Sequence, residues 1–321
     1  MRPTAEGTVE EAQGPVAHGG VYVGAPGPMR RLAARLGNST TSFVMPAVIF
    51  MGAMVLVPTV YDLYLSLTSW NLAEGTPRVF SGLHNYHSLL GDQRFWASLE
   101  RTLVFSAAST ILTLALGLAL ALLLNRPLPG KSLFRTLLLV PMVMTPVVVG
   151  LTWRFLYDPQ LGVVNWLIGL SGMKPVAFLG QATTALPAVI ATDVWEYTPF
   201  ALLILLAGLE GLPPAPFEAA QIDGASRLGT LWHVTLPMMK GPLAVALLFR
   251  LMLSFNVFDT LYIMTGGGPG YSSETLVMYA YRVGFIQWEV GRAATLAVVT
   301  LILVIVIARI VIRFVRPEAT D

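Results

Sequence analysis

A run of 23 residues at 102–124 contains no charged side chain. An α-helix of this length, rising ~1.5 Å per residue, crosses the roughly 30 Å hydrocarbon core of a bilayer. The whole chain is 55% hydrophobic and 12% charged, about half of the ~25% charged residues usual in soluble domains. With a mean hydropathy of +0.68, the sequence predicts a protein that crosses the membrane several times.

The apolar pattern predicts an all-α integral membrane protein with six transmembrane helices. The expected spans are 42–67, 102–124, 136–156, 184–207, 241–264 and a sixth that ends near Ile312. Residues 1–29 are rich in Gly, Pro and Ala and lack an apolar run, so we expect a disordered cytoplasmic tail. We expect residues 30–316 to form the transmembrane permease domain and 317–321 to form a short C-terminal tail.

The distribution of lysine and arginine predicts the orientation, because cytoplasmic loops carry an excess of both. Placing both termini inside puts eleven such residues on cytoplasmic flanks: Arg30, Arg31, Arg35, Arg126, Lys131, Arg135, Arg227, Lys240, Arg309, Arg313 and Arg316. Seven fall outside: Arg78, Arg94, Arg101, Arg154, Lys174, Arg282 and Arg292. The excess favours cytoplasmic termini and a cytoplasmic loop at 208–240.

Several kinds of chemistry are excluded by residue types that the chain lacks. It has no cysteine and only four scattered histidines, so disulfides, thiolate chemistry and a metal site are not expected. No G-x-x-x-x-G-K-[ST] loop occurs, and the glycine-rich turn at 265–270 has no lysine, so the chain is not expected to bind or hydrolyse a nucleotide. We predict no catalytic residue, no metal and no cofactor bound by this chain.

The polar interval 208–240 has the signals of two short helices. Three prolines suit the first turn of a helix, and Glu218 follows there, where a carboxylate complements the helix dipole. Gly224 breaks the helix, and Asp223 or Ser226 can cap the next one. We expect the second helix to reach Thr235 and to end at the Leu236–Pro237 pair.

This interval resembles the EAA loop of ABC-importer permeases. The matching residues are Glu218, Ala219, Ala220, Asp223, Gly224, Ala225, Leu236 and Pro237. The resemblance implies a type I ABC importer permease fold in which this cytoplasmic coupling loop seats in a cleft of an ATP-binding subunit. Further likeness lies in Thr198-Pro199-Phe200, in the 265–270 turn followed by Glu274-Thr275-Leu276, and in Asn85-Tyr86 and Phe95-Trp96. The chain is similar to the permeases of maltose, glycerol-3-phosphate and trehalose importers.

That family implies a set of partners and a place in the cell. The expected partners are a second homologous permease, two ATP-binding subunits that hold ATP and Mg²⁺, and an extracytoplasmic solute-binding protein. The expected location is the plasma membrane of a prokaryote. The implied function is alternating access for a sugar, oligosaccharide or polyol phosphate.

Polar side chains within the predicted spans are costly when they face lipid, so they should face a cavity or one another. The candidates for a substrate pathway are Asp193, Glu196, Tyr197, Arg250, Asn256 and Asp259. One reading is that they line a polar route for a hydroxyl-rich solute. The other is that Arg250 pairs with a carboxylate and locks two helices together. Trp195, Tyr197 and Tyr262 could stack on sugar rings or serve only in packing.

Other functions remain open on the sequence alone. An ion-coupled secondary transporter would use Asp193 and Glu196 for coupling, although the coupling loop argues against this class. A membrane-embedded enzyme would need clustered His, Asp or Ser near one membrane face, which the sequence lacks. An ABC permease for a non-sugar solute, such as an amino acid or a metal, is a closer alternative.

Overall fold

The computed structural model describes residues 39–75, 77–127 and 129–315, so the expected tails at 1–29 and 317–321 lie outside the described residues. The chain divides into two units, residues 1–58 and 59–321, which are described separately. The first unit contains the start of helix α2 (Ser39–Ser66), with Pro46 and Pro58 inside the helix. This helix corresponds to the span predicted at 42–67.

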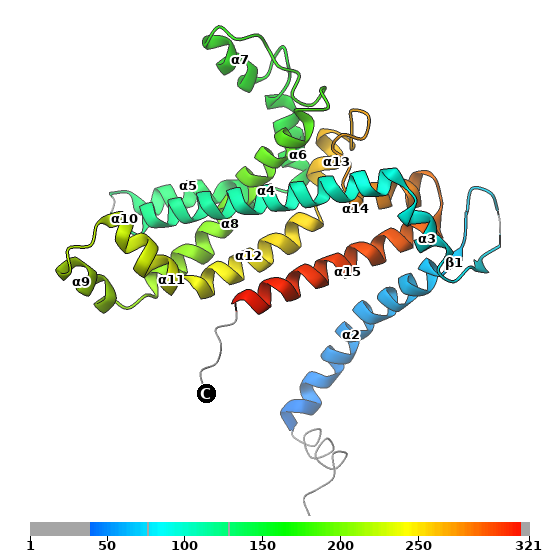
Figure 1. The fold of residues 1–321 in the computed structure, drawn as a ribbon, viewed down its shortest axis with the longest axis horizontal. Helices are drawn as coiled ribbons and strands as arrows, with labels where there is room; N and C mark the ends of the chain where they lie inside the picture. The colour runs from blue at the N-terminus through cyan, green and yellow to red at the C-terminus, as the bar shows by residue number, and fades with distance from the viewer. Residues whose placement is uncertain (1–38, 76, 128, 316–321) are drawn as a thin grey trace, which may run out of the picture. The chain divides into compact units, whose positions relative to one another are not determined.

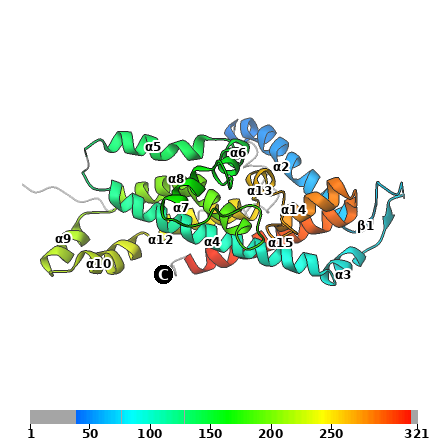
Figure 2. The same cartoon turned by 90° about the horizontal axis from the view of Figure 1, so that it is seen from above.

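Four long helices of the second unit run side by side: α4 (Gln93–Leu124), α8 (Ala185–Glu210), α12 (Lys240–Phe255) and α15 (Val290–Val315) (Figures 1 and 2). Helices α4 and α8 make the most extensive contact. A Cβ added at Gly117 would lie 2.7 Å from the Cβ of Ala201. Small residues therefore let the two backbones approach closely, as is common between membrane helices.

Two of the predicted spans are broken, and their prediction as single helices is wrong. The third divides into α5 (Lys131–Val143) and α6 (Pro146–Leu156), which meet at 98°. Pro146 explains the break, because the residue before a proline avoids the helical region and Thr145 is extended with ψ 145°. The fifth ends as α12 at Phe255, and residues up to Met264 form a separate helix, α13 (Asp259–Met264).

Within the described ranges, four helices are long and apolar enough to cross a membrane, and six spans result if each bent pair counts as one. The second bent pair joins Arg227–Met238 to α12 at 70°. The predicted all-α membrane fold with six spans is consistent with this arrangement.

One end of the bundle holds short elements that precede α4. These are the strands β1 (Thr68–Ser69) and β2 (Val79–Phe80), paired antiparallel, and helix α3 (His84–Leu90). Asn85 Nδ2 donates to the carbonyls of Ser66 and Thr68 at 3.0 and 2.8 Å, which satisfies the last carbonyl of α2 and one carbonyl of β1. Helix α4 starts at Gln93 rather than at residue 102, because Asp92 caps it by accepting from the Arg94 amide at 2.8 Å.

The opposite end of the bundle carries α9 (Ala215–Ile222), α10 (Arg227–Thr230), the π-helical turn η1 (Leu231–Thr235) and α11 (Leu236–Met238) (Figure 1). The remaining elements are α7 (Val163–Leu170), α14 (Leu276–Tyr281) and the π-helical turn η2 (Arg282–Ile286). The second unit therefore presents a helical loop at one end and an α3–β1 edge at the other.

Candidate functional site: a helical loop and a buried polar cluster

The turn between α9 and α10 is fixed by a glycine. Gly224 has φ +71°, a conformation that side chains rarely adopt. Its amide donates to the Gln221 carbonyl at 3.1 Å, and the Ala225 amide donates to the Ala220 carbonyl at 2.9 Å. This pair of bonds is a Schellman motif, the common glycine-terminated helix end. The glycine hinge expected from the sequence is thus present.

The second half of this loop differs from the prediction. Ser226 caps α10 by accepting from the Gly229 amide at 3.1 Å, as one of the two expected caps. The helix does not end at Leu236–Pro237, however, but continues through η1 and α11 to Met238. A proline inside a helix displaces the carbonyl four residues earlier. The wider π-turn just before Pro237 accommodates that displacement.

The surface of the loop exposes large apolar side chains among polar ones. Ile222, Leu228 and Trp232 are 86%, 69% and 65% exposed. Exposed apolar patches with polar surroundings mark interaction sites. Among the residues that the structure describes, Glu218 forms no ion pair, and it does not pair with Arg227 across the hinge. Ala220 is buried, whereas Ala219 and Asp223 are exposed.

Deep in the bundle, Arg250 on α12 pairs with Asp193 on α8. Arg250 Nη2 donates to Asp193 Oδ2, and Arg250 Nε donates to the Thr113 hydroxyl on α4 at 3.3 Å. The two charged side chains are 0% and 2% exposed. The arginine therefore joins three helices. This contact matches the pairing interpretation of Arg250.

Glu196 lies one helical turn from Asp193 on the same face of α8 and contacts a different helix. Its Oε2 accepts from the Thr260 hydroxyl of α13 at 3.3 Å, and that hydroxyl lies 3.4 Å from the carbonyl of Pro146. Thr260 thereby links the two breaks in the third and fifth spans. We call Asp193, Glu196, Arg250, Thr113 and Thr260 the polar cluster.

The other pathway candidates lie at or beyond the border of this cluster. The Tyr197 ring lies 4.8 Å from the Arg250 guanidinium. Asp259 is exposed at the first turn of α13. Asn256 is exposed, donates to the Met252 carbonyl at 2.8 Å and lines a separate cavity of about 260 Å³. The structure therefore brings Asp193, Glu196, Tyr197 and Arg250 together, places Asp259 exposed next to Thr260, and leaves Asn256 apart.

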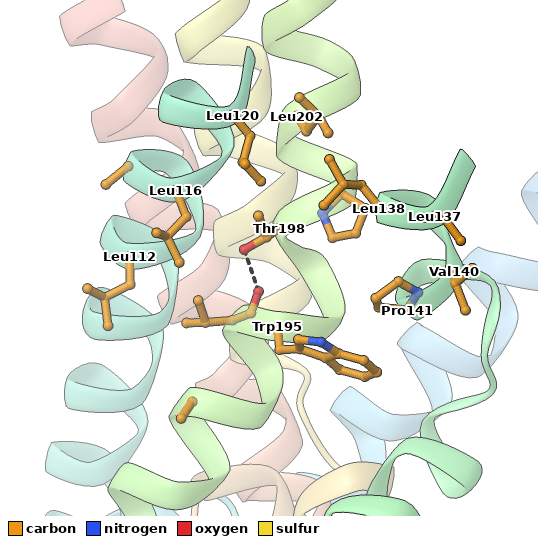
Figure 3. Close-up of a pocket in the computed structure, with 14 residues that line it drawn as sticks. Leu112, Leu116, Leu120, Leu137, Leu138, Val140, Pro141, Trp195, Thr198 and Leu202 are labelled. Atoms are coloured by element: carbon orange, nitrogen blue, oxygen red, sulfur yellow. Dashed lines mark hydrogen bonds between the residues drawn. The ribbon is translucent and has the colours of Figure 1, made fainter. Parts of the chain in front are cut away.

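A hollow beside α8 is apolar. A groove of about 840 Å³ lies between α4, α5 and α8, lined by leucines together with Trp195, Thr198 and Pro199 (Figure 3). The Trp195 ring lies 5.4 Å from that of Trp153, and the Thr198 hydroxyl is occupied by the Val194 carbonyl at 2.6 Å. Trp195 thus faces an apolar groove rather than the polar cluster.

The burial of one further carboxylate, Glu274, was not predicted from the sequence. Glu274 is fully buried and accepts from Arg94 at 2.7 Å through both oxygens and from Arg282 Nε at 3.0 Å. Arg282 also donates to the carbonyl of Gly266 at 3.0 Å. These bonds tie the glycine-rich turn to the start of α4. Because Arg94 and Glu274 are 180 residues apart, no local pattern could indicate the pair.

Asp92 lies in a related network at the same end of the bundle. It accepts from the Tyr279 hydroxyl at 2.5 Å and from Arg292 at 2.6 Å. Partial burial opposes ionisation of Asp92, but the Tyr279 hydroxyl, the Arg94 amide and the charge of Arg292 outweigh it and hold the pKa of Asp92 below its ordinary value. Three of the arginines predicted on outer flanks, Arg94, Arg282 and Arg292, thus bind carboxylates.

Neither loop nor cluster has the residues of a metal site. Among the described residues, no group of three or more His, Cys, Asp or Glu side chains is arranged to hold a metal ion. The fold and the two sites together define a polytopic membrane protein with a polar centre and a helical loop at one end that exposes large apolar side chains.

The family of this protein follows from its sequence. Residues 89–320 match the family of binding-protein-dependent transport system inner membrane components, and the chain belongs to that family. It is 40% identical to a probable ABC transporter permease, y4oQ, of Sinorhizobium fredii over 87% of this chain and 90% of the relative. The predicted resemblance to ABC-importer permeases is confirmed.

Other relatives carry more specific names. The trehalose/maltose transport system permease MalF of Thermococcus litoralis is 34% identical over 82% of this chain and 88% of its own length. The trehalose transport system permease SugA of Mycobacterium tuberculosis is 38% identical over 88% of this chain and 91% of its own. A chain of a bacterial ABC transporter for alginate superposes with a TM-score of 0.76 at 23% identity, over 91% of this chain and all of that chain, which supports the same fold.

Proposed function

We propose that this chain is the membrane-spanning subunit of an ATP-driven importer of a carbohydrate. Relatives named for trehalose, maltose and sn-glycerol-3-phosphate transport support this substrate class. The chain would pair with a second homologous permease, two ATP-binding subunits holding ATP and Mg²⁺, and an extracytoplasmic solute-binding protein. Both termini would lie in the cytoplasm, as the arginine and lysine distribution indicates.

The observation that carries the proposal is the α9–Gly224–α10 loop. It places exposed apolar side chains at one end of the bundle and continues through η1 and α11 into α12, the helix that holds Arg250. A movement imposed on the loop by an ATPase pair would therefore act on a helix of the polar cluster. Coupling of this kind requires two conformations of the permease to which the ATPase pair binds with different affinity.

Within the cluster, we assign different tasks to the two carboxylates of α8. The Asp193–Arg250 pair is fully buried and joins helices, so its task is structural. Glu196 is buried, but it accepts from the neutral Thr260 hydroxyl rather than from an arginine, so its carboxylate can accept further hydrogen bonds from a hydroxyl-rich solute. Tyr197 is partly exposed and Asp259 is exposed, so both are accessible to such a solute. Asn256 would contact the solute at its own, separate cavity.

An ion-coupled carrier is the rival that uses the same carboxylates. Reconstitution separates the two functions. Proteoliposomes should hold this chain with its second permease and ATPase subunits, and radiolabelled trehalose and maltose should be offered with the binding protein. We expect uptake that needs ATP and the binding protein and survives collapse of ion gradients. Uptake by this chain without ATP, driven by an ion gradient, would contradict the proposal.

A further inference from the structure

Four aromatic rings on α13, α14 and η2 form a continuous row. Phe258 stacks on Tyr262 with ring centres 5.4 Å apart, and both contact Tyr281 at 4.9 and 5.4 Å. Tyr281 in turn stacks on Phe285 at 5.3 Å and an interplanar angle of 23°. We call these four residues and Trp288 the aromatic track.

The track is open rather than packed away. Tyr262 is 41% and Phe285 is 68% exposed. Phe258, Tyr281, Phe285 and Trp288 line a cavity of about 560 Å³, a volume within the roughly 300–1,000 Å³ of ligand pockets. A row of contacting rings that borders a cavity offers flat faces to a ligand instead of filling a core.

The backbone holds Trp288 in place at a conformational cost. Trp288 has φ +61°, which is rare for a bulky residue. Its carbonyl accepts from the Leu72 amide at 3.0 Å, and the adjacent Glu289 forms a β-bridge with Asn71. Strained backbone conformations that the surrounding contacts hold in place are concentrated at functional sites. The fold thus maintains an indole ring, half exposed, at this cavity.

Two carboxylates border the track. Asp62 of α2 lines the same cavity as Trp288. Asp259 follows Phe258 directly, and the next residue, Thr260, binds Glu196 of the polar cluster. A pyranose ring presents slightly positive C–H groups on its faces and hydroxyls around its rim. Aromatic faces are negative and carboxylates accept hydrogen bonds, so the track matches both parts of a sugar ring.

We propose that the aromatic track is a saccharide-binding path that leads from the cavity at Asp62 and Trp288 to the polar cluster. This inference rests on the proposed function. The sugar rings stack in turn on Phe285, Tyr281 and Tyr262, and the two aspartates bind their hydroxyls. The start of α15 and the α3–β1 edge lie at the bundle end away from α9 and α10 (Figures 1 and 2), so the path opens on the side opposite the docking loop.

Thiol labelling tests whether the track borders an aqueous path. The chain has no cysteine, so Phe285→Cys introduces a single thiol. The wild-type chain serves as the unlabelled control. Ile305→Cys, at an exposed position of α15, serves as the control for a lipid-facing thiol. In the assembled importer, a membrane-impermeant thiol reagent should label Phe285→Cys and spare Ile305→Cys. Saturating trehalose or maltose, whichever the wild type imports, should slow the labelling severalfold. A Phe285→Cys chain that is as unreactive as the control would overturn the proposal.

Transport with matched substitutions tests stacking itself. Phe285→Tyr keeps a flat ring, whereas Phe285→Leu keeps apolar volume without one. For variants that assemble normally, we expect Phe285→Tyr to retain uptake and Phe285→Leu to lower uptake about three- to tenfold. This is the change expected from the loss of one aromatic contact. Equal uptake by the two variants would mean that Phe285 packs against lipid or a partner subunit. That result would overturn the saccharide-binding role of the aromatic track but not the proposed function. Failure of the wild type to import any saccharide would instead overturn the proposed function.

Discussion

Loss of Arg250 should destabilise the protein severely. Its side chain is fully buried, pairs with Asp193, and also contacts Thr113 and the Tyr197 ring. Arg250→Met leaves the Asp193 carboxylate without a cation in the bundle centre. Breaking a buried pair in this way costs ~3–5 kcal/mol, which is a change of about 100-fold or more in the folding equilibrium.

The matching double variant separates structure from transport. Arg250→Met with Asp193→Leu removes both charges, and such replacements are often neutral or stabilising. We therefore expect the double variant to be more stable than either single one. Arg250→Lys should fall between wild type and Met, because a single ammonium cannot reproduce the forked contacts to Asp193 and Thr113.

The assay is thermal unfolding of the purified assembly in detergent, with monodispersity followed by size exclusion. Lys174→Met, which removes an exposed loop charge, serves as the control and should change little. A double variant whose loss of stability equals the sum of the two single losses would show that the two residues act independently. An Arg250→Met chain with wild-type stability would refute the structural task of the pair.

Three further outcomes are expected. Gly224→Asp should fold, because aspartate tolerates positive φ and no atom of the described chain lies within 4 Å of the new Cβ. It should nevertheless weaken attachment of the ATPase subunits in a pull-down, and Glu218→Ala should weaken it more mildly. Normal attachment of both variants would contradict the docking role of the loop. Because the pKa of Asp92 lies below its ordinary value, its stabilisation is complete above a pH of about 4 and is lost as the pH falls through the lowered pKa. Asp92→Asn should thus lower thermal stability at pH 7, with a gap that closes in acid; a gap independent of pH would contradict this. Glu274→Gln should loosen the glycine-rich turn, seen as faster proteolysis there, and an unchanged cleavage rate would argue against the tie to Arg94.

Much of the fold could be predicted because the membrane limits the alternatives. Apolar length alone located the helices, and the glycine and serine signals placed the hinge of the loop. The bends within the spans were harder to predict. Pro146 was visible in the sequence, but prolines are also tolerated within membrane helices. The break after Phe255 has no proline and depends on tertiary contacts of α13, such as that of Thr260 with Glu196.

The residue types of the candidate site could be predicted from the sequence, but the contacts between those residues could not. The depth of Arg250 in an apolar span indicated a partner or a cavity, and only the structure selects Asp193. Asn256 fits the same sequence criterion yet lies at a separate cavity, because helix α12 ends there. Glu274 looked like part of an outer turn, and its burial with two arginines depends on contacts across the whole chain.

The most direct test of the account is the energy source of transport. Uptake of radiolabelled trehalose and maltose should be measured in proteoliposomes that contain the full assembly, with wild-type chain or Gly224→Asp, while ATP is supplied on the side of the α9–α10 loop. We predict ATP-dependent uptake with the wild type and strongly reduced uptake with Gly224→Asp despite normal insertion. Saccharide uptake that persists without ATP, or that the loop variant leaves unchanged, would contradict the account.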